Sequence, residues 1–272
     1  MKSFDCKVAV ITGSGSGIGR ALAVELAERR AVLALSDVDG AGLAETAALC
    51  EKAGARVSQT VLDVSDRAAM YRHADQVQAE LGTANLVVNN AGVALTASVE
   101  EMTWEDFEWI VGVNFWGVMH GTKAFLPQLI SSGEAHLVNL SSVFGFIGVP
   151  SQSAYNATKF AVRGFTEALR QEMRIAGHPV GVSCVHPGGI KTNIARNSRA
   201  ADGHDKASLT KEFDRITVTS PEAAARRIMR GVRRNQARIL IGPDAYGIDL
   251  LPRALGSGYQ LLVSEAAKRA IR

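Results

Sequence analysis

The sequence predicts an α/β fold, a doubly wound parallel sheet of about seven strands with helices on both faces. Two observations lead to this prediction. Apolar runs of strand length alternate with longer amphipathic, alanine-rich stretches along the chain. The short runs are apolar at successive positions rather than at every second one, which is typical of strands covered on both faces. The 272 residues suit one large α/β domain.

Each predicted element has its own local signal. The predicted strands are Lys7–Thr12, Ala31–Asp37, Arg56–Leu62, Leu86–Asn89, His136–Leu140, Val180–His186 and Arg238–Ile241. The helical patterns between them include Ile18–Arg30, Asp39–Ala53, Asp66–Leu81, Thr103–Leu126 and Ser153–Ala176. Helix starts are indicated by Asp39, by Thr103 with Asp106 three residues on, and by Ser220 followed by Pro221.

One domain is predicted over residues 1–272, with a core at about 5–242 and a C-terminal extension at about 243–272. The chain has no repeat, low-complexity tract or linker that would divide it. Asn193–Ser208 is rich in small and charged residues, so we expect a mobile loop there that closes over the substrate and excludes water.

Composition excludes several classes of partner. Net charge is only +3, which is too small to argue for a nucleic acid or a membrane surface as a partner. Cys6, Cys50 and Cys184 lack metal-ligand spacing and are odd in number, as expected of free thiols in a reducing compartment. No apolar signal region precedes the first strand, and no apolar run approaches the roughly 18 residues of a membrane span. These features predict a cytoplasmic protein without a metal or a transmembrane segment.

A glycine-rich turn joins the first strand to the first helix. It consists of Thr12, Gly13, Ser14, Gly15, Ser16, Gly17, Ile18 and Gly19. Glycines let the backbone bring a pyrophosphate against the helix N-terminus, where free N–H groups stabilise negative charge. The alternative is a simple tight connection between a strand and a helix.

Asp37 ends the second predicted strand, about 20 residues after the turn, where an acid binds adenosine ribose hydroxyls and repels a 2′-phosphate. No Arg or Lys lies in the Gly13–Gly19 turn or next to Asp37 to neutralise that phosphate. NAD is therefore favoured over NADP, which remains the alternative. A solvated carboxylate at a strand end is the structural alternative for Asp37.

Tyr155 and Lys159 lie four residues apart, on one face if the segment is helical. A tyrosine titrates at about 10, and a cationic field worth roughly 4 kcal/mol would lower that pKa to about 7. Such a phenol transfers protons at working pH. The pair is also common on ordinary helices, so the argument depends on the neighbouring motifs.

These motifs together resemble the short-chain dehydrogenase/reductase family of the TGxxxGIG and YxxxK type, over roughly Lys7 to Asn193. The matching positions are Thr12 to Gly19, Asp63-Val64, Asn89 to Gly92, Asn114, Ser142, Tyr155 with Lys159, and Pro187 to Thr192. The resemblance implies a Rossmann-like fold and hydride transfer between NAD and an alcohol or ketone. Thr158 stands where the family often has Ser, and we attach no consequence to that difference.

The resemblance implies catalytic roles for Asn114, Ser142, Tyr155 and Lys159. Tyr155 would be the general acid/base, and Lys159 would lower its pKa and bind the nicotinamide ribose. Ser142 would stabilise charge on the substrate oxygen, with Ser141 as the less favoured alternative. Asn114 would interrupt its helix and hold a water that connects Lys159 to solvent.

The resemblance also implies a cofactor-binding set. Its members are Gly13, Ser14, Ser16, Gly17, Ile18, Gly19, Asp37, Asp63, Val64, Asn90, Ala91, Gly92, Tyr155, Lys159, Pro187, Gly188, Ile190 and Thr192. Asp63 and Val64 would flank the adenine, and Thr192 would bind the carboxamide. Asn89 is expected to brace the sheet rather than act chemically, and His186, before a proline turn, is expected to be structural.

The segments expected to line the substrate pocket are largely apolar. They contain Leu95, Phe144, Phe146, Ile147, Val149 and Pro150, with Gln152 and Ser153 as polar points. This favours a secondary alcohol or ketone with a hydrophobic body, unless these residues are core or subunit contacts. The family resemblance further implies a homodimer or homotetramer joined through the helices in Thr103–Leu126 and Ser153–Ala176.

Two C-terminal features have no place in the family pattern. A predicted helix after Ser220 carries Arg226, Arg227, Arg230, Arg233 and Arg234, which form either a solvated face or a site for an anion or partner. The tail Asp244–Arg272 is rich in apolar residues, which must cover something. It is expected to pack beside the substrate mouth, in a subunit interface or on a membrane surface. A nucleotide-binding sensor without turnover is the alternative for the whole chain, although such a protein should lack the Tyr, Lys and Ser set.

Overall fold

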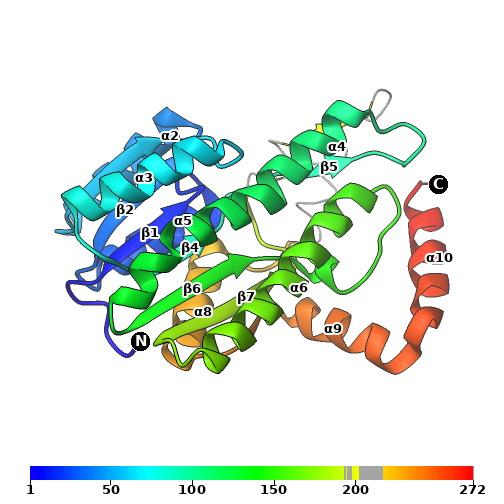
Figure 1. Cartoon of the computed structure of the whole chain (residues 1–272). Helices are drawn as coiled ribbons and strands as arrows, with labels where there is room; N and C mark the ends of the chain where they lie inside the picture. The colour runs from blue at the N-terminus through cyan, green and yellow to red at the C-terminus, as the bar shows by residue number, and fades with distance from the viewer. Residues whose placement is uncertain (193, 195–197, 202–216, 272) are drawn as a thin grey trace.

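The computed structural model describes residues 1–192, 194, 198–201 and 217–271, and its centre is a parallel sheet (Figure 1). Its strands are β1 (Val8–Thr12), β2 (Val32–Asp37), β3 (Val57–Val61), β4 (Ala84–Asn89), β6 (Ala135–Leu140), β7 (Val180–Pro187) and β9 (Arg238–Ile241). They pair in the order β3-β2-β1-β4-β6-β7-β9, and every pair is parallel. The predicted seven-stranded doubly wound sheet is confirmed. The strand order reverses between β1 and β4, where sheets of this kind form a crevice for ligands.

Two layers of helices cover the sheet. On one face α1 (Gly17–Ala27), α2 (Gly40–Lys52) and α8 (Pro221–Arg233) bury leucine, alanine and isoleucine side chains against it. On the other face α3 (Arg67–Glu80), α5 (Gly117–Ser131) and α6 (Ser153–Ile175) pack around the fully buried Phe125. The inner strands β1 and β6 are buried along their whole length, which explains their apolar sequences, whereas the edge strand β3 is partly exposed and contains Ser58, Gln59 and Thr60.

The predicted helix starts are confirmed by side-chain caps. Asp39 accepts hydrogen bonds from the Ala41 and Gly42 amides, Thr103 accepts one from the Asp106 amide, and Ser220 accepts one from Ala223. Each cap satisfies an amide at a helix N-terminus that would otherwise lack a partner.

The long helical pattern from Thr103 is interrupted once. It comprises α4 (Trp104–Val111), a π-helical turn at Gly112–Trp116 and then α5. A π turn shifts the backbone hydrogen bonds by one residue and often marks a functional position. Asn114 lies at its centre, so the predicted local break is confirmed.

A second, two-stranded sheet was not predicted. β5 (Leu95–Thr96) pairs in parallel with β8 (Arg199–Ala200). β8 falls within the Asn193–Ser208 segment expected to be a loop, so that expectation is wrong at Arg199–Ala200. Residues 193, 195–197 and 202–208 of the segment lie outside the described residues. The pairing places the described part of the segment beside the start of the predicted substrate wall.

The C-terminal tail forms an arm beside the sheet, the orange and red segment of Figure 1. It comprises α9 (Pro243–Leu255), a 3₁₀ turn (Gly256–Gly258) and α10 (Tyr259–Ile271). Ala245, Ile248, Tyr259 and Val263 pack on the segment Val143–Val149, which contains the 3₁₀ turn η2 (Val143–Gly145). Of the three expected locations, the structure therefore shows the tail beside the predicted substrate mouth.

The apolar face of α8 is buried as expected, and its arginine face points outward. Ala224, Ala225, Ile228, Met229 and Val232 belong to the core, whereas Arg230, Arg233 and Arg234 line a hollow together with Lys2. Among the described helices, none is both long and apolar enough to cross a membrane.

Candidate active site

The glycine-rich turn crosses the carboxyl ends of β1 and β4. Gly13 and Gly17 have positive φ angles of 65° and 53°, which side chains of L-residues rarely allow. A Cβ at Gly13 would lie 2.7 Å from the Ala91 Cα, and one at Gly19 would overlap the Gly13 carbonyl. The turn is therefore packed too closely for side chains at these positions. It leads directly into the N-terminus of α1, where an anion is stabilised.

Asparagines at the end of β4 hold this region together. The Asn90 side-chain amide donates to the carbonyls of Thr12 and Gly13, both at 2.9 Å. The backbone amide of Asn90 donates to the Thr12 hydroxyl. Asn89 is buried and donates to Asn139 Oδ1 at 2.8 Å across the sheet. The bracing role expected of Asn89 is confirmed, and the Asn90 side chain also supports the turn.

Asp37 lies at the end of β2 and faces the turn. One carboxylate oxygen accepts from the Gly15 amide at 2.7 Å, and the other accepts from the Asp39 amide at 2.9 Å. Arg20, just beyond the turn, also lies nearby, a neighbour that the motif comparison missed. Its guanidinium donates to the Gly15 carbonyl and to Glu45 at 2.5 and 2.9 Å, so its charge is partly balanced by Glu45.

Asp63 and Val64 follow β3 on the same edge of the sheet. Asp63 is exposed and uses Oδ1 to accept from the amide and hydroxyl of Ser65. The buried Val64 accepts from His120 Nδ1 at 3.0 Å through its carbonyl. Asp63 thus caps the turn that follows β3.

Asn114 in the π turn reaches back to β4 and across to α6. Its Oδ1 accepts from the Val93 amide at 2.8 Å, and its Nδ2 donates to the Val93 carbonyl and to Thr158 Oγ1. Both Nδ2 hydrogens are thus used, whereas Oδ1 has capacity for a second hydrogen bond, so a water at this point could bond either Oδ1 or the main chain. Thr158, to which the sequence gave no role, accepts one of these bonds.

Tyr155 and Lys159 leave the same side of α6, as their spacing predicts. The buried Lys159 ammonium lies 5.5 Å from the centre of the Tyr155 ring and donates to the Leu140 carbonyl at 3.1 Å. A Cβ at Gly92 would lie 3.3 Å from Asn114 Oδ1 and 3.5 Å from Lys159 Nζ. The structure thus brings Asn114, Tyr155 and Lys159 together beside the Gly92 backbone.

The pKa of Tyr155 is opposite in direction to the sequence expectation. Burial raises the pKa of Tyr155 to about 12, and a hydrogen bond with Ser142 only partly opposes this effect. Burial also lowers the pKa of Lys159 to about 8. The ammonium bonds a carbonyl rather than the phenol, so desolvation dominates and the phenol is neutral at pH 7.

Ser142 and His186 form the back of the site. His186 Nδ1 donates to the Ser142 carbonyl at 3.0 Å, and its ring stacks on Phe146 with centres 4.2 Å apart. Burial lowers the pKa of His186 to about 4, so the ring is neutral at physiological pH. The structural role expected of His186 is confirmed. It fixes the backbone of Ser142, whose hydroxyl accepts from the Phe144 amide at 3.1 Å.

The turn at Pro187–Thr192 is supported by a residue that the sequence did not single out. Asp244, in the first turn of α9, accepts from the Gly189 amide at 2.7 Å. A Cβ at Gly188 would overlap its carboxylate, which explains the glycine there. A Cβ at Gly17 would lie 3.1 Å from Thr192 Cγ2, so the turn reaches the glycine-rich loop.

Some residues of the predicted substrate wall belong to the core, and others face the candidate site. Leu95, Phe146 and Ile147 are buried in apolar clusters, which is the core alternative. Phe144 remains half-buried and contacts the Tyr155 ring edge-on, with centres 6.0 Å apart. Phe144 is therefore the aromatic member of the wall that faces the candidate site.

Comparison with known proteins agrees with this geometry. The sequence pattern of the family described as short chain dehydrogenase matches residues 7–203. The chain belongs to the short-chain dehydrogenase family. It is 57% identical to "Putative oxidoreductase SadH" of Mycobacterium tuberculosis, over 97% of this chain and 96% of that protein. It is 34% identical to "Estradiol 17-beta-dehydrogenase 11" of Homo sapiens, over 93% of this chain and 81% of that protein.

A crystal structure of another short-chain dehydrogenase is also similar. It is a short chain dehydrogenase/reductase from Burkholderia phymatum in complex with NAD, with a TM-score of 0.88 and 34% identity. The match covers 93% of this chain and 95% of that one. This agreement in sheet and helices confirms the Rossmann-like α/β fold, and the chain is an oxidoreductase by family.

Proposed function

We propose that this short-chain dehydrogenase transfers a hydride between NAD and a secondary alcohol or ketone with a hydrophobic body. One observation carries the proposal: Ser142, Tyr155, Lys159 and Asn114 converge at the carboxyl ends of β4 and β6. The hydrogen bond of Ser142 to Tyr155 supports a common place for a substrate oxygen. The ammonium of Lys159 and the π turn at Asn114 complete the arrangement.

The shape of the turn supports a dinucleotide. Positions at which a Cβ would collide form a cradle along the turn and at Gly92. The residues proposed to hold the cofactor are Gly13, Ser14, Ser16, Gly17, Ile18, Gly19, Asp37, Asp63, Val64, Asn90, Ala91, Gly92, Tyr155, Lys159, Pro187, Gly188, Ile190 and Thr192. When bound, nicotinamide supplies or accepts the hydride. The similar B. phymatum structure contains NAD, and the negative charge of Asp37, with the nearby Arg20 paired to Glu45, favours NAD over NADP here too.

The chain's own groups move the proton. Tyr155 is neutral at pH 7, the form that donates a proton to a ketone oxygen, and Ser142 holds that oxygen by a second hydrogen bond. In the reverse direction Tyr155 must first ionise, which its buried position opposes. The cationic form of Lys159 favours the phenolate, and a water bonded to the main chain at Asn114 would return the proton to solvent.

The proposal that the substrate has a hydrophobic body rests on the apolar side chains of the predicted substrate wall. Phe144, which contacts Tyr155, and Val149 are half-buried apolar side chains of this wall. The Gln152 side chain donates to Thr96 at 2.9 Å and so already has a partner. The relative named for estradiol dehydrogenation also suggests a hydroxyl carried on an apolar body. A sugar or a charged acid would find few polar partners on such a wall.

Replacement of Tyr155 by Phe tests the function. The change removes only the transferable proton, so we expect turnover to fall by about 10²-fold to 10⁴-fold. NADH binding, followed by fluorescence titration, should stay within about twofold. Tyr246→Phe is the matched control, because Tyr246 is exposed on α9. Retention of more than about a tenth of the wild-type rate by Tyr155→Phe would falsify the assignment. If the wild type turned over no alcohol or ketone in a broad screen, the sensor alternative would be favoured.

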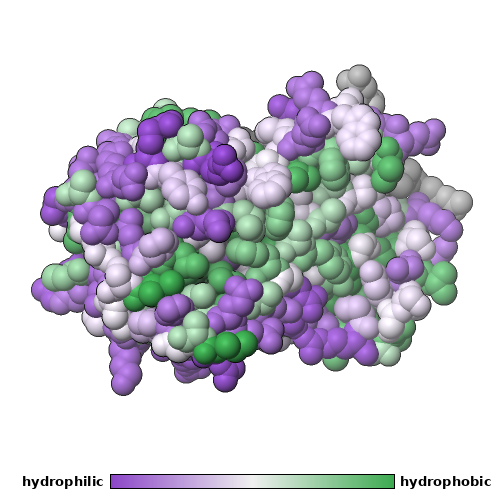
Figure 2. Space-filling view, in the orientation of Figure 1, coloured by the Kyte–Doolittle hydropathy of each residue, from purple (hydrophilic) through white to green (hydrophobic). Residues whose placement is uncertain are grey.

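We also propose a homodimer or homotetramer formed through α5 and α6. Trp116 and Phe160, at the start of α5 and on α6, are 49% and 41% exposed. Figure 2 shows an apolar band across the centre of the face that these helices form. Sedimentation of the wild type at monomer mass at micromolar concentration would contradict this proposal.

A further inference from the structure

The segment Val143–Val149 leads from Ser142 into the proposed substrate wall, and α6 holds its inner side. Asn156 donates to the carbonyls of Phe144 and Ile147 at 2.8 and 2.7 Å and accepts from the Val149 amide at 3.0 Å. Arg163 donates to the Gly145 carbonyl at 3.2 Å. On this side, four backbone groups of the segment are satisfied by two side chains.

The outer side of the segment is held by the C-terminal arm. The Gly148 amide donates to the Tyr259 hydroxyl at 3.0 Å. Tyr259 begins α10, where the chain turns back from α9 through Gly256 at a φ of 55°. Tyr259 and Val263 also pack on the buried cluster that contains Phe146. Among the described residues, this is the hydrogen bond that joins α10 to the segment.

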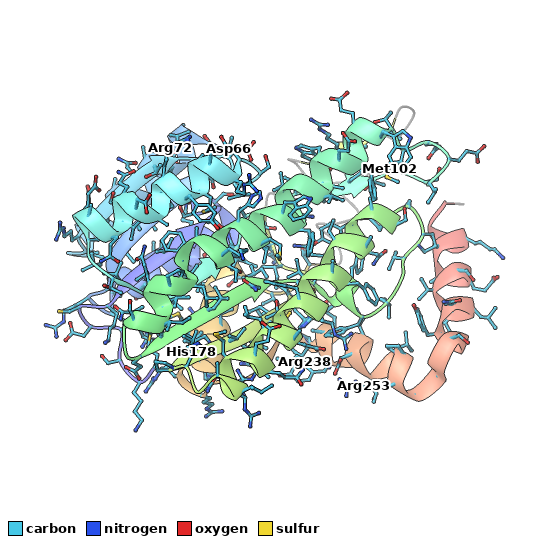
Figure 3. All side chains as sticks on the ribbon, in the orientation of Figure 1. Asp66, Arg72, Met102, His178, Arg238 and Arg253 are labelled. Carbon is cyan, nitrogen blue, oxygen red and sulfur yellow. The ribbon has the colours of Figure 1, made fainter. Side chains whose placement is uncertain are left out.

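The arm is itself anchored to the sheet. Arg238 of β9 donates to Asp249 of α9 at 2.9 Å and to Glu167 of α6 at 2.8 Å, and it lies between α6 and α9 in Figure 3. Its guanidinium also lies over the Phe146 ring, 5.2 Å from the centre. A fixed α9 therefore delivers Tyr259 to Gly148 at a defined position. A displacement of Tyr259 would shift Gly148 and, through the short segment, Phe144, which contacts Tyr155.

We propose that the C-terminal arm selects the size of substrate that the proposed site accepts, and that Tyr259 is its specificity-determining residue. This inference rests on the proposed dehydrogenase function. Tyr259 acts by positioning: it holds the wall, and the wall contacts the body of the substrate. A small alcohol that ends short of the wall depends little on this support, whereas a long apolar chain lies against it.

The test compares chain-length profiles. Wild type, Tyr259→Phe, Tyr259→Ala and the exposed control Tyr246→Phe are assayed by NADH absorbance with 2-alkanols from 2-butanol to 2-decanol. Loss of the hydroxyl should lower kcat/KM for 2-decanol about threefold to tenfold, as expected for one lost hydrogen bond. Tyr259→Ala, which also loses the packing of the ring, should lower it further. The KM for NAD and the kcat/KM for 2-butanol should stay within twofold for both variants.

A second measurement does not depend on turnover. Hydrogen exchange followed by mass spectrometry should show faster exchange in the peptide that contains Gly148 for Tyr259→Phe, and no change for Tyr246→Phe. Unchanged exchange, or parallel chain-length profiles in wild type and Tyr259→Phe, overturns the inference and leaves the proposed function standing. A wild type that oxidises none of the alkanols and reduces none of the matching ketones, 2-butanone to 2-decanone, counts against the proposed function, and the inference falls with it.

Discussion

Replacement of Asp37 by Asn and by Ala separates two effects of its carboxylate. The group accepts from the Gly15 amide at 2.7 Å, so it supports the glycine-rich turn as well as carrying charge. Asn removes the charge and keeps an oxygen for Gly15. Ala removes both. The difference between the variants therefore measures the support, and the difference between Asn and wild type measures the charge.

The size of the charge effect follows from Coulomb's law. A 2′-phosphate with about two negative charges, taken at about 6 Å from the carboxylate, is repelled by about 1.4 kcal/mol in water. The repulsion rises to about 5.5 kcal/mol at an effective dielectric constant of about 20. Asp37 is half-buried, so the lower value is the safer guide, and it corresponds to about tenfold in affinity. Loss of charged hydrogen bonds to the ribose should weaken NADH by about tenfold or more.

Fluorescence titration of NADH and NADPH measures both dissociation constants. For Asp37→Asn their ratio should move about 100-fold toward NADPH. Asp37→Ala should show the same shift and weaker binding of both cofactors, because the Gly15 amide loses its acceptor. Asp39→Asn is the control: Asp39 is exposed, and Asn caps a helix as well as Asp does. A ratio for Asp37→Asn within twofold of wild type would refute the reasoning.

Three further changes test other parts of the molecule. Asp244→Ala leaves the Gly189 amide without its acceptor, so NADH affinity should fall about tenfold by the same titration, and Asp244→Asn should restore most of it. Because burial raises the pKa of Tyr155 to about 12, ketone reduction should vary less than about twofold from pH 6 to 7.5, while alcohol oxidation rises with pH; a falling reduction rate would contradict this. A Cβ at Gly121 would overlap Asn89 Oδ1, so Gly121→Ala should lower the free energy of urea unfolding by about 1–3 kcal/mol. Gly164→Ala, where nothing lies within 4 Å, should not lower it.

Much of the fold can be read from local sequence. The inner strands such as β1 and β6 are predictable because they are buried on both faces, so the apolar run carries the signal without a partner, whereas the edge strand β3 has no buried residue. The caps at Asp39 and Thr103 bond amides two or three residues away, which makes them visible in the sequence. The glycines of the turn are required by close backbone contacts. The Tyr155–Lys159 pair is placed together by helical spacing alone.

The rest depends on contacts that the chain makes at long range. Tyr259 meets Gly148 across 111 positions, and β5 pairs with a strand more than 100 residues later, so no local pattern reveals either. The predicted lowering of the Tyr155 pKa is wrong for a related reason. The spacing fixes which residue is near, but it does not fix how deeply both are buried or that Lys159 bonds the Leu140 carbonyl. Asn156 directly follows Tyr155 and was overlooked, because an Asn in a helix gives no sign of the segment it supports.

Two residues that hold loops at the rim of the site lie outside the family pattern. That pattern ends at residue 203, and both Asp244 and Tyr259 come after it. Each accepts from one backbone amide near the candidate site: Asp244 from Gly189, beside Ile190, and Tyr259 from Gly148, in the segment that follows Ser142. On the proposed function, the reacting groups lie within the family pattern, while the C-terminal arm bonds two of the loops around them. Chains with the same motifs and different arms should therefore share the reaction and differ in the substrates they accept.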